Sequence, residues 1–152
     1  MITPLQTATK KGYVDIGKML ITGGVQIDAK SSFGWTALHF AAKYNQSMIL
    51  EMLLKNGASV EVQNSIGATP LHIATCQNSV EILIHMGAKI DAIDSYGQTP
   101  IYLSLVHKRF SIVSMLLKNG ASLHTRNTAG LTLLESAFLF LAFWLICSKY
   151  KF

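Results

Sequence analysis

The residues that could hold a metal ion or attack a substrate are five histidines and two cysteines. His39 and His72 recur in similar positions, but structural zinc needs four ligands and this pair supplies only two. His85, His107 and His124 have no cysteine or carboxylate at the spacing of a metal-ligand motif. The sequence therefore predicts no metal site.

Cys76 is the candidate nucleophile, but the residues around it match no known nucleophile motif, and a general base would have to come from elsewhere in the fold. The pair Gly23-Gly24 lacks both the spacing and the lysine of a phosphate-binding loop. Four carboxylates recur in or near the expected loops, where solvation and turn hydrogen bonds account for them: Asp28, Glu61, Asp91 and Asp94. We therefore expect no enzyme activity, no cofactor and no small-molecule substrate.

The composition indicates one folded domain. The chain has 152 residues and is 50% hydrophobic but only 14% charged, which excludes an intrinsically disordered chain. Two cysteines are too few for a disulfide framework, so reducing, intracellular conditions are the natural expectation. We predict a cytoplasmic protein and leave nuclear placement and membrane association open.

The net charge of +5 raises the question of a nucleic-acid partner. Residues 1–107 contain seven basic and seven acidic residues, whereas residues 108–152 contain six basic residues and one acidic residue. A surface that follows a duplex needs Lys and Arg along one face of the protein. The charge balance over residues 1–107 therefore argues against nucleic acid.

A repeat of about 33 residues runs along most of the chain. Five similar segments begin at Thr3, Thr36, Thr69, Thr99 and Thr132, in steps of 33, 33, 30 and 33 residues. Two sets of glycines keep the last three of these steps: Gly34, Gly67, Gly97 and Gly130, and Gly24, Gly57, Gly87 and Gly120. Because three independent series of residues share the same spacing, the repeat is not a coincidence of composition.

The segment Thr69-Pro70-Leu71-His72, with its variants in the other copies, resembles the signature of the ankyrin repeat. The resemblance covers about residues 3–137 and implies an all-α fold, an ankyrin-repeat solenoid of stacked helix–turn–helix units with short β-hairpin loops. It also implies that His39 and His72 hydrogen-bond to a threonine hydroxyl and to neighbouring backbone. We expect an array of about four repeats over residues 1–130, and a degenerate fifth repeat or apolar tail over residues 131–152.

Each repeat has its own start and stop signals. A threonine such as Thr36, Thr69 or Thr99 caps a first helix, and a glycine of the second set ends a second helix in a left-handed conformation. The third copy is three residues short between Ala74 and Val80, so we expect its inter-helix turn and the start of its second helix to be cropped. The first copy lacks the polar character of a terminal repeat, which favours a segment of a longer array or a truncated gene product.

A partner protein is the remaining ligand class, and the resemblance implies that the hairpin tips and the exposed ends of the first helices bind it on the concave side. The predicted partner-binding residues are Lys30, Ser32, Phe33, Trp35, Tyr44, Gln63, Ser65, Ile66, Ile93, Ser95, Tyr96 and Gln98. Further helix positions beside them are Lys10, Lys11, Lys43, Gln77 and His107. Accessible aromatic residues are common interface anchors, although Trp35 and Ile66 could instead pack between adjacent hairpins. We expect a monomer that binds an unidentified protein.

The C-terminal segment is a run of eleven apolar residues, 137–147, followed by Lys149 and Lys151. Three interpretations stay open: a helix that covers the end of the stack, a membrane contact, or an ending foreign to the fold. A spanning helix needs about 20 apolar residues, so contact at the membrane interface is the more economical form of the second interpretation. The alternative function is thus a membrane-tethered adaptor anchored by this segment.

Overall fold

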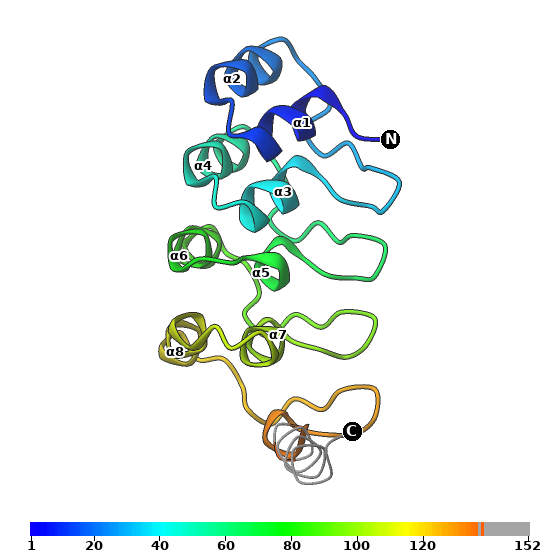
Figure 1. Ribbon diagram of the computed structural model, residues 1–152, viewed down its shortest axis with the longest axis vertical. Helices are drawn as coiled ribbons and strands as arrows, with labels where there is room; N and C mark the ends of the chain where they lie inside the picture. The colour runs from blue at the N-terminus through cyan, green and yellow to red at the C-terminus, as the bar shows by residue number, and fades with distance from the viewer. Residues whose placement is uncertain (137, 139–152) are drawn as a thin grey trace, which may run out of the picture.

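The computed structural model describes residues 1–136 and residue 138. Within these residues, the helices α1 to α8 form four helix pairs. The pairs are α1 (Pro4–Lys11) with α2 (Val14–Thr22), α3 (Ala37–Lys43) with α4 (Ser47–Lys55), α5 (Pro70–Ile73) with α6 (Gln77–His85), and α7 (Pro100–Val106) with α8 (Phe110–Lys118). The pairs stack in chain order, so that the first helices (α1, α3, α5, α7) form one layer and the second helices (α2, α4, α6, α8) form another (Figure 1). The predicted all-α solenoid is confirmed.

The helix ends follow the predicted signals. Thr3 and Gln6 form a reciprocal cap on α1, because each side chain accepts a hydrogen bond from the other residue's backbone N–H. At the other end of the repeat, Gly57 has a φ of 89°, and the equivalent glycines adopt the same left-handed conformation. Such a residue lets the chain leave the second helix without the steric cost that a β-carbon would bring.

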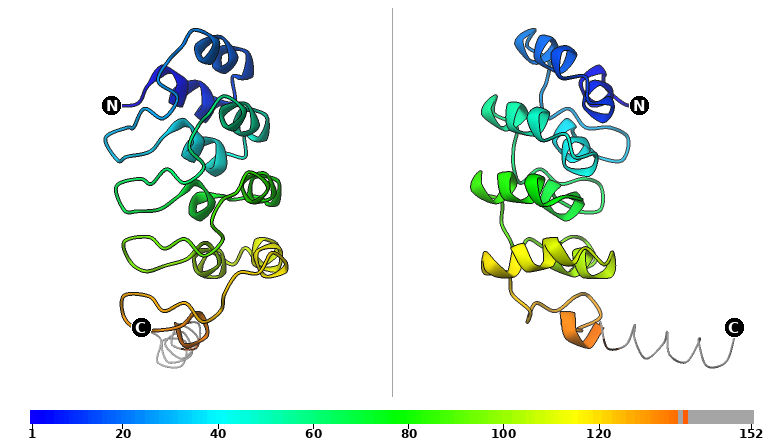
Figure 2. Two further views of the ribbon diagram at one scale, coloured as in Figure 1. Left: turned by 180° about the vertical axis from the view of Figure 1, so that it is seen from behind. Right: turned by 60° about the vertical axis from the view of Figure 1, so that its left-hand side comes forward.

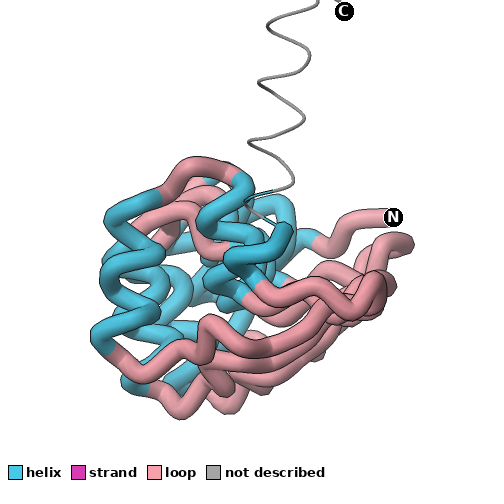
Figure 3. The backbone as a smooth tube through the Cα atoms, turned by 90° about the horizontal axis from the view of Figure 1, so that it is seen from below, coloured by secondary structure: helices cyan, strands magenta, loops and turns pink. Residues whose placement is uncertain are grey.

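The loops between repeats project from one side of the stack (Figure 2). Each is hairpin-shaped, and the amide of Asn64, for example, donates to the carbonyl of Ala68 at 3.0 Å. The described residues contain no β-strand (Figure 3). The backbone bonds within a loop are this closing bond and a tight-turn bond such as that of Gly67 to Asn64, and single bonds such as that of Ser65 to Phe33 join consecutive loops. Gly34 shows how closely the loops approach, since a β-carbon built on it would lie 2.5 Å from the amide nitrogen of Ser65.

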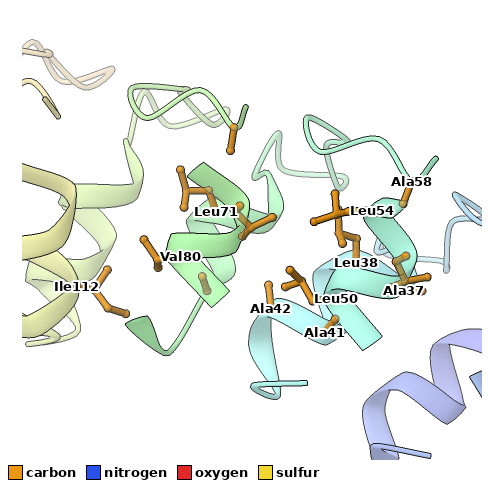
Figure 4. Close-up of a cluster of buried hydrophobic side chains, with 14 of the residues drawn as sticks. Ala37, Leu38, Ala41, Ala42, Leu50, Leu54, Ala58, Leu71, Val80 and Ile112 are labelled. Carbon is orange, nitrogen blue, oxygen red and sulfur yellow. The ribbon is translucent and has the colours of Figure 1, made fainter. Parts of the chain in front are cut away.

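The core lies between the two helix layers and continues from repeat to repeat (Figure 4). Its largest side chains are aliphatic and fully buried: Leu38, Ile49, Leu50, Leu53, Leu83, Ile101, Ile112 and Leu116. Each contributes about 1.5–3 kcal/mol through burial. Ala41 of α3 and Ala74 at the end of α5 are both buried, and α3 packs against α5.

The third repeat differs from its predicted form. The helix α6 has nine residues, as α2, α4 and α8 do, and three residues separate α5 from α6, as they separate α3 from α4. The first helix α5 has only four residues, whereas α3 and α7 have seven. The prediction of a cropped turn and second helix was therefore wrong, because the deletion removes the last turn of the first helix. The physical reason is burial, since α6 supplies the fully buried Val80 and Leu83, whereas Lys43 at the end of α3 is exposed.

A neighbouring repeat compensates for the missing turn. In the second repeat the carbonyl of Ala41 accepts a hydrogen bond from the amide of Gln46 at 3.0 Å. The equivalent carbonyl in the third repeat belongs to Ala74, and it accepts a hydrogen bond from Nη1 of Arg109 at 3.1 Å. A side chain of the fourth repeat thus satisfies a backbone acceptor that the deletion left open.

No helix within the described residues is long and apolar enough to cross a membrane. The apolar run 137–147, on which the predicted cap and membrane contact both depend, lies outside those residues except for Phe138, which is exposed.

Candidate protein-binding surface

The structure places the predicted loop residues on the projecting side of the stack. Those exposed to solvent are Lys30, Ser32, Phe33, Gln63, Ser65, Ile66, Ile93, Ser95 and Tyr96. Trp35 and Gln98 are half-buried, and Tyr44 is exposed at the end of α3. Most of the side chains predicted to bind a partner at the loop tips are therefore accessible to solvent.

Three large side chains occupy the same position in successive loops, and we call Phe33, Ile66 and Tyr96 the loop-tip row. Their side chains are 74%, 44% and 54% exposed. Their backbones are fixed, because each carbonyl accepts a hydrogen bond from an amide of the next loop, at 3.1 Å, 2.9 Å and 3.1 Å respectively. The row is thus an exposed apolar feature on a backbone that is already ordered, which lowers the entropy cost of binding.

The loops are also joined through side chains. The ammonium group of Lys30 donates to the carbonyl of Gln63 at 2.9 Å, and the hydroxyl of Thr128 donates to the carbonyl of Tyr96 at 3.0 Å. These contacts hold consecutive loops in register along the stack.

A second group of aromatic side chains lies on the first-helix layer, and Trp35, Phe40, Tyr44, Lys10 and Lys43 form what we call the aromatic–lysine cluster. The ring centroids of Trp35 and Phe40 are 5.2 Å apart, and those of Phe40 and Tyr44 are 6.4 Å apart in a stacked arrangement. The Lys43 ammonium lies 5.1 Å from the centroid of Trp35 and 5.8 Å from that of Tyr44. The Lys10 ammonium lies 5.8 Å from the Tyr44 centroid, so two repeats meet at this ring.

Trp35 therefore packs against the first helix of its own repeat, where its ring also lies 5.8 Å from that of His39. The sequence predicted Trp35 among the loop tips, with packing between adjacent hairpins as the alternative, and its ring contacts are instead with α3. Phe40 was missed altogether, although its spacing of four residues from Tyr44 on a predicted helix would have placed both rings on one face.

The two signature histidines have structural roles, as the resemblance implied. Nε2 of His39 lies 3.0 Å from the carbonyl oxygen of Ala68, so this nitrogen carries the ring proton. Nδ1 then accepts a hydrogen bond from the amide of Thr36 at 3.2 Å, with the Thr36 hydroxyl 3.0 Å away. Burial lowers the pKa of His39 to about 4, because the ring is desolvated and only partly compensated by its bond to the Ala68 carbonyl.

His72 repeats this arrangement one unit later, with Nε2 3.0 Å from the carbonyl oxygen of Gln98, and burial lowers its pKa too. In the first repeat Gln6 takes the same place. Its amide nitrogen donates to the carbonyls of Ala29 and Trp35, and its oxygen accepts from the amide of Thr3. A neutral side chain with a donor nitrogen and a separate acceptor atom therefore satisfies the site.

Three of the predicted loop carboxylates hydrogen-bond to the next repeat. The carboxylates of Asp28, Glu61 and Asp91 accept hydrogen bonds from the amides of Ser59, Lys89 and Ser122, each in the next repeat. These three acids are spaced 33 and 30 residues apart, as the repeats are, and this spacing could have indicated their shared role from the sequence. Asp94 alone fits the simple expectation, since it accepts from the amides of Tyr96 and Gln98 within its own loop.

The half-buried Cys76 caps α6, where its sulfur accepts a hydrogen bond from the amide of Ser79 at 3.4 Å. Among the described residues, no group of three or more His, Cys, Asp or Glu side chains could hold a metal ion.

Stacked helix pairs with projecting loops define the class of protein, a helical repeat solenoid. A family model described as ankyrin repeats (3 copies) matches residues 2–64 and 60–127, and the chain therefore belongs to the ankyrin-repeat family. Comparison with curated proteins finds no match. Ankyrin repeats are generally protein–protein interaction modules, and the family is typically non-catalytic.

Proposed function

We propose that this chain is a non-catalytic module that binds a partner protein through its loop tips and the adjoining surface of its first helices. The observation that carries this proposal is the loop-tip row. Phe33, Ile66 and Tyr96 expose large apolar side chains at equivalent positions of consecutive loops, on a backbone held by loop-to-loop hydrogen bonds. Accessible aromatic anchors on a rigid scaffold are typical of protein interfaces.

The test compares two double variants of the full chain in co-precipitation from cells. Phe33→Ser with Tyr96→Ser removes two anchors of the loop-tip row. Met19→Ser with Met48→Ser is the matched control, because these side chains are 72% and 71% exposed but lie on second helices. We expect both variants to keep the thermal stability of the wild type within about 0.5 kcal/mol.

Proteins retained by the wild type and by the methionine variant, but lost from the Phe33/Tyr96 variant, would be the partners of this surface. Equal retention by all three proteins would refute the role of the loop-tip row. The membrane-tether alternative depends on residues 137–147, outside the described part of the chain, and stays a hypothesis.

A further inference from the structure

The charges of the array are sorted between its two helix layers, although they balance along the sequence. The first helices α1, α3, α5 and α7 and the turns that follow them contain no Asp or Glu, whereas the helical residues 133–136 of the fifth copy contain Glu135. These four helices and their turns carry five basic residues: Lys10, Lys11, Lys43, Lys108 and Arg109. The second helices carry three acids and three bases: Asp15, Glu51, Glu81, Lys18, Lys55 and Lys118.

The other carboxylates do not neutralise the first-helix layer. Asp28, Glu61 and Asp91 bond to the backbone of the next repeat, and Asp94 is buried in its own loop. The ion pairs within the described residues are Lys55 with Glu51 and Arg126 with Glu135, and neither involves α1, α3, α5 or α7. The surface formed by α1, α3 and α7 is therefore positive, and its basic side chains form no ion pair within the described residues.

The aromatic–lysine cluster concentrates this charge at the first two repeats. Lys10 and Lys43 occupy equivalent positions in the last turns of α1 and α3, where the helix dipole favours a cation without neutralising it. Both ammonium groups lie over the ring of Tyr44, and both side chains are exposed. The site thus presents two cations from adjacent repeats beside a stacked pair of aromatic rings.

A ligand that complements this surface needs carboxylates for the two ammonium groups and an apolar group for the rings of Phe40 and Tyr44. A phosphate backbone is the poorer match, because the basic row is interrupted. The third repeat lacks the last turn of its first helix, and Arg109 in the fourth repeat is bonded to the carbonyl of Ala74. The charges are therefore clustered rather than spread along the stack, as a duplex would require.

We propose that the aromatic–lysine cluster binds an acidic segment of a partner protein, with Asp or Glu side chains against Lys10 and Lys43 and an apolar residue against Phe40 and Tyr44. This inference rests on the proposed function and names the chemistry of the partner at one part of that surface.

The test is fluorescence anisotropy of the full-length protein with a labelled glutamate-rich peptide that carries two central leucines. Its counterparts are the same peptide with glutamine in place of glutamate, and a single-stranded oligonucleotide of equal charge. We expect the glutamate peptide to bind best and to bind more weakly as salt is added.

Lys10→Glu with Lys43→Glu should weaken binding of the glutamate peptide by about tenfold or more, since two exposed attractions become repulsions. Lys18→Glu with Lys118→Glu is the matched control, because it changes the net charge equally but on the second-helix layer, and we expect it to have little effect. Tyr44→Ser should weaken binding through loss of the ring.

Three results would overturn the inference: equal weakening by both charge reversals, oligonucleotide binding as tight as that of the glutamate peptide, or no binding of the glutamate peptide. The proposed function has a separate outcome. If cellular partners depend on Phe33 and Tyr96 but not on Lys10 and Lys43, the loop-tip row stands and the acidic-segment site fails.

Discussion

Replacement of His39 by glutamine should remove a defined part of the protein's sensitivity to acid. The pKa of His39 is lowered to about 4 in the folded protein, against about 6.5 in an unfolded chain. Between these pH values the unfolded chain binds a proton at His39 that the folded protein does not bind. The free energy of unfolding therefore falls as the pH falls through this window. Above the window, His39 is neutral in both the folded and the unfolded chain, and this loss of stability is absent.

The magnitude follows from the two pKa values. Lowering the pH from about 7.5 to about 5 should cost the wild type about 2 kcal/mol through His39 alone. His72 adds a loss in the same direction, because its pKa is lowered as well. Glutamine at position 39 cannot take up this proton, and Gln6 shows that a glutamine side chain satisfies the equivalent site in the first repeat.

The assay is urea unfolding of the wild type, of His39→Gln and of His39→Gln with His72→Gln at both pH values. We expect His39→Gln to lose about 2 kcal/mol less than the wild type on acidification, and the double variant to lose less again. A loss equal to that of the wild type would refute the reasoning. A titration of the His39 ring by NMR in the wild type provides an independent check, and a pKa near 6.5 would also refute it.

Two further predictions concern contacts between repeats. Arg109→Ala should destabilise the stack by about 1–3 kcal/mol, because the buried carbonyl of Ala74 loses its charged donor. Thermal unfolding should show Arg109→Lys to be less destabilised than Arg109→Ala. Equal melting temperatures for the wild type and Arg109→Ala would contradict this prediction. Gly34→Ala should cost more than Gly57→Ala, since both glycines have positive φ but only the β-carbon at position 34 would meet the backbone of Ser65. Urea unfolding that ranks the two alanine variants in the opposite order would argue against the loop-to-loop contact.

Much of the fold could be predicted from the sequence because its determinants are local. The reciprocal cap of Thr3 and Gln6 spans three residues, and the left-handed glycine at position 57 acts on its own backbone. The hydrogen bonds of His39 were implied by the family resemblance, and one of them joins neighbours within a single helical turn. The same local features then recur at the repeat spacing along the chain.

The candidate site was predicted only in part. The exposure of Phe33, Ile66 and Tyr96 agrees with loop tips placed by the repeat rhythm. The contacts of Trp35 could not be read in the same way, because whether its ring turns toward the loop or toward α3 depends on packing against Phe40 and on the position of Lys43.

The sequence by itself determined that the chain is an array of helix pairs and where each pair begins and ends, and its family resemblance implied that His39 and His72 hydrogen-bond to backbone. It could also place the exposed loop tips, since the helix caps and the loop positions recur with the repeat. Only the tertiary structure decided that α5 loses its last turn, that Arg109 compensates for it, and that basic residues gather on the first-helix layer. The physical reason is distance along the chain. Contacts such as that of Arg109 with Ala74 join residues 35 positions apart, and they exist only once the stacking of repeats brings those residues together.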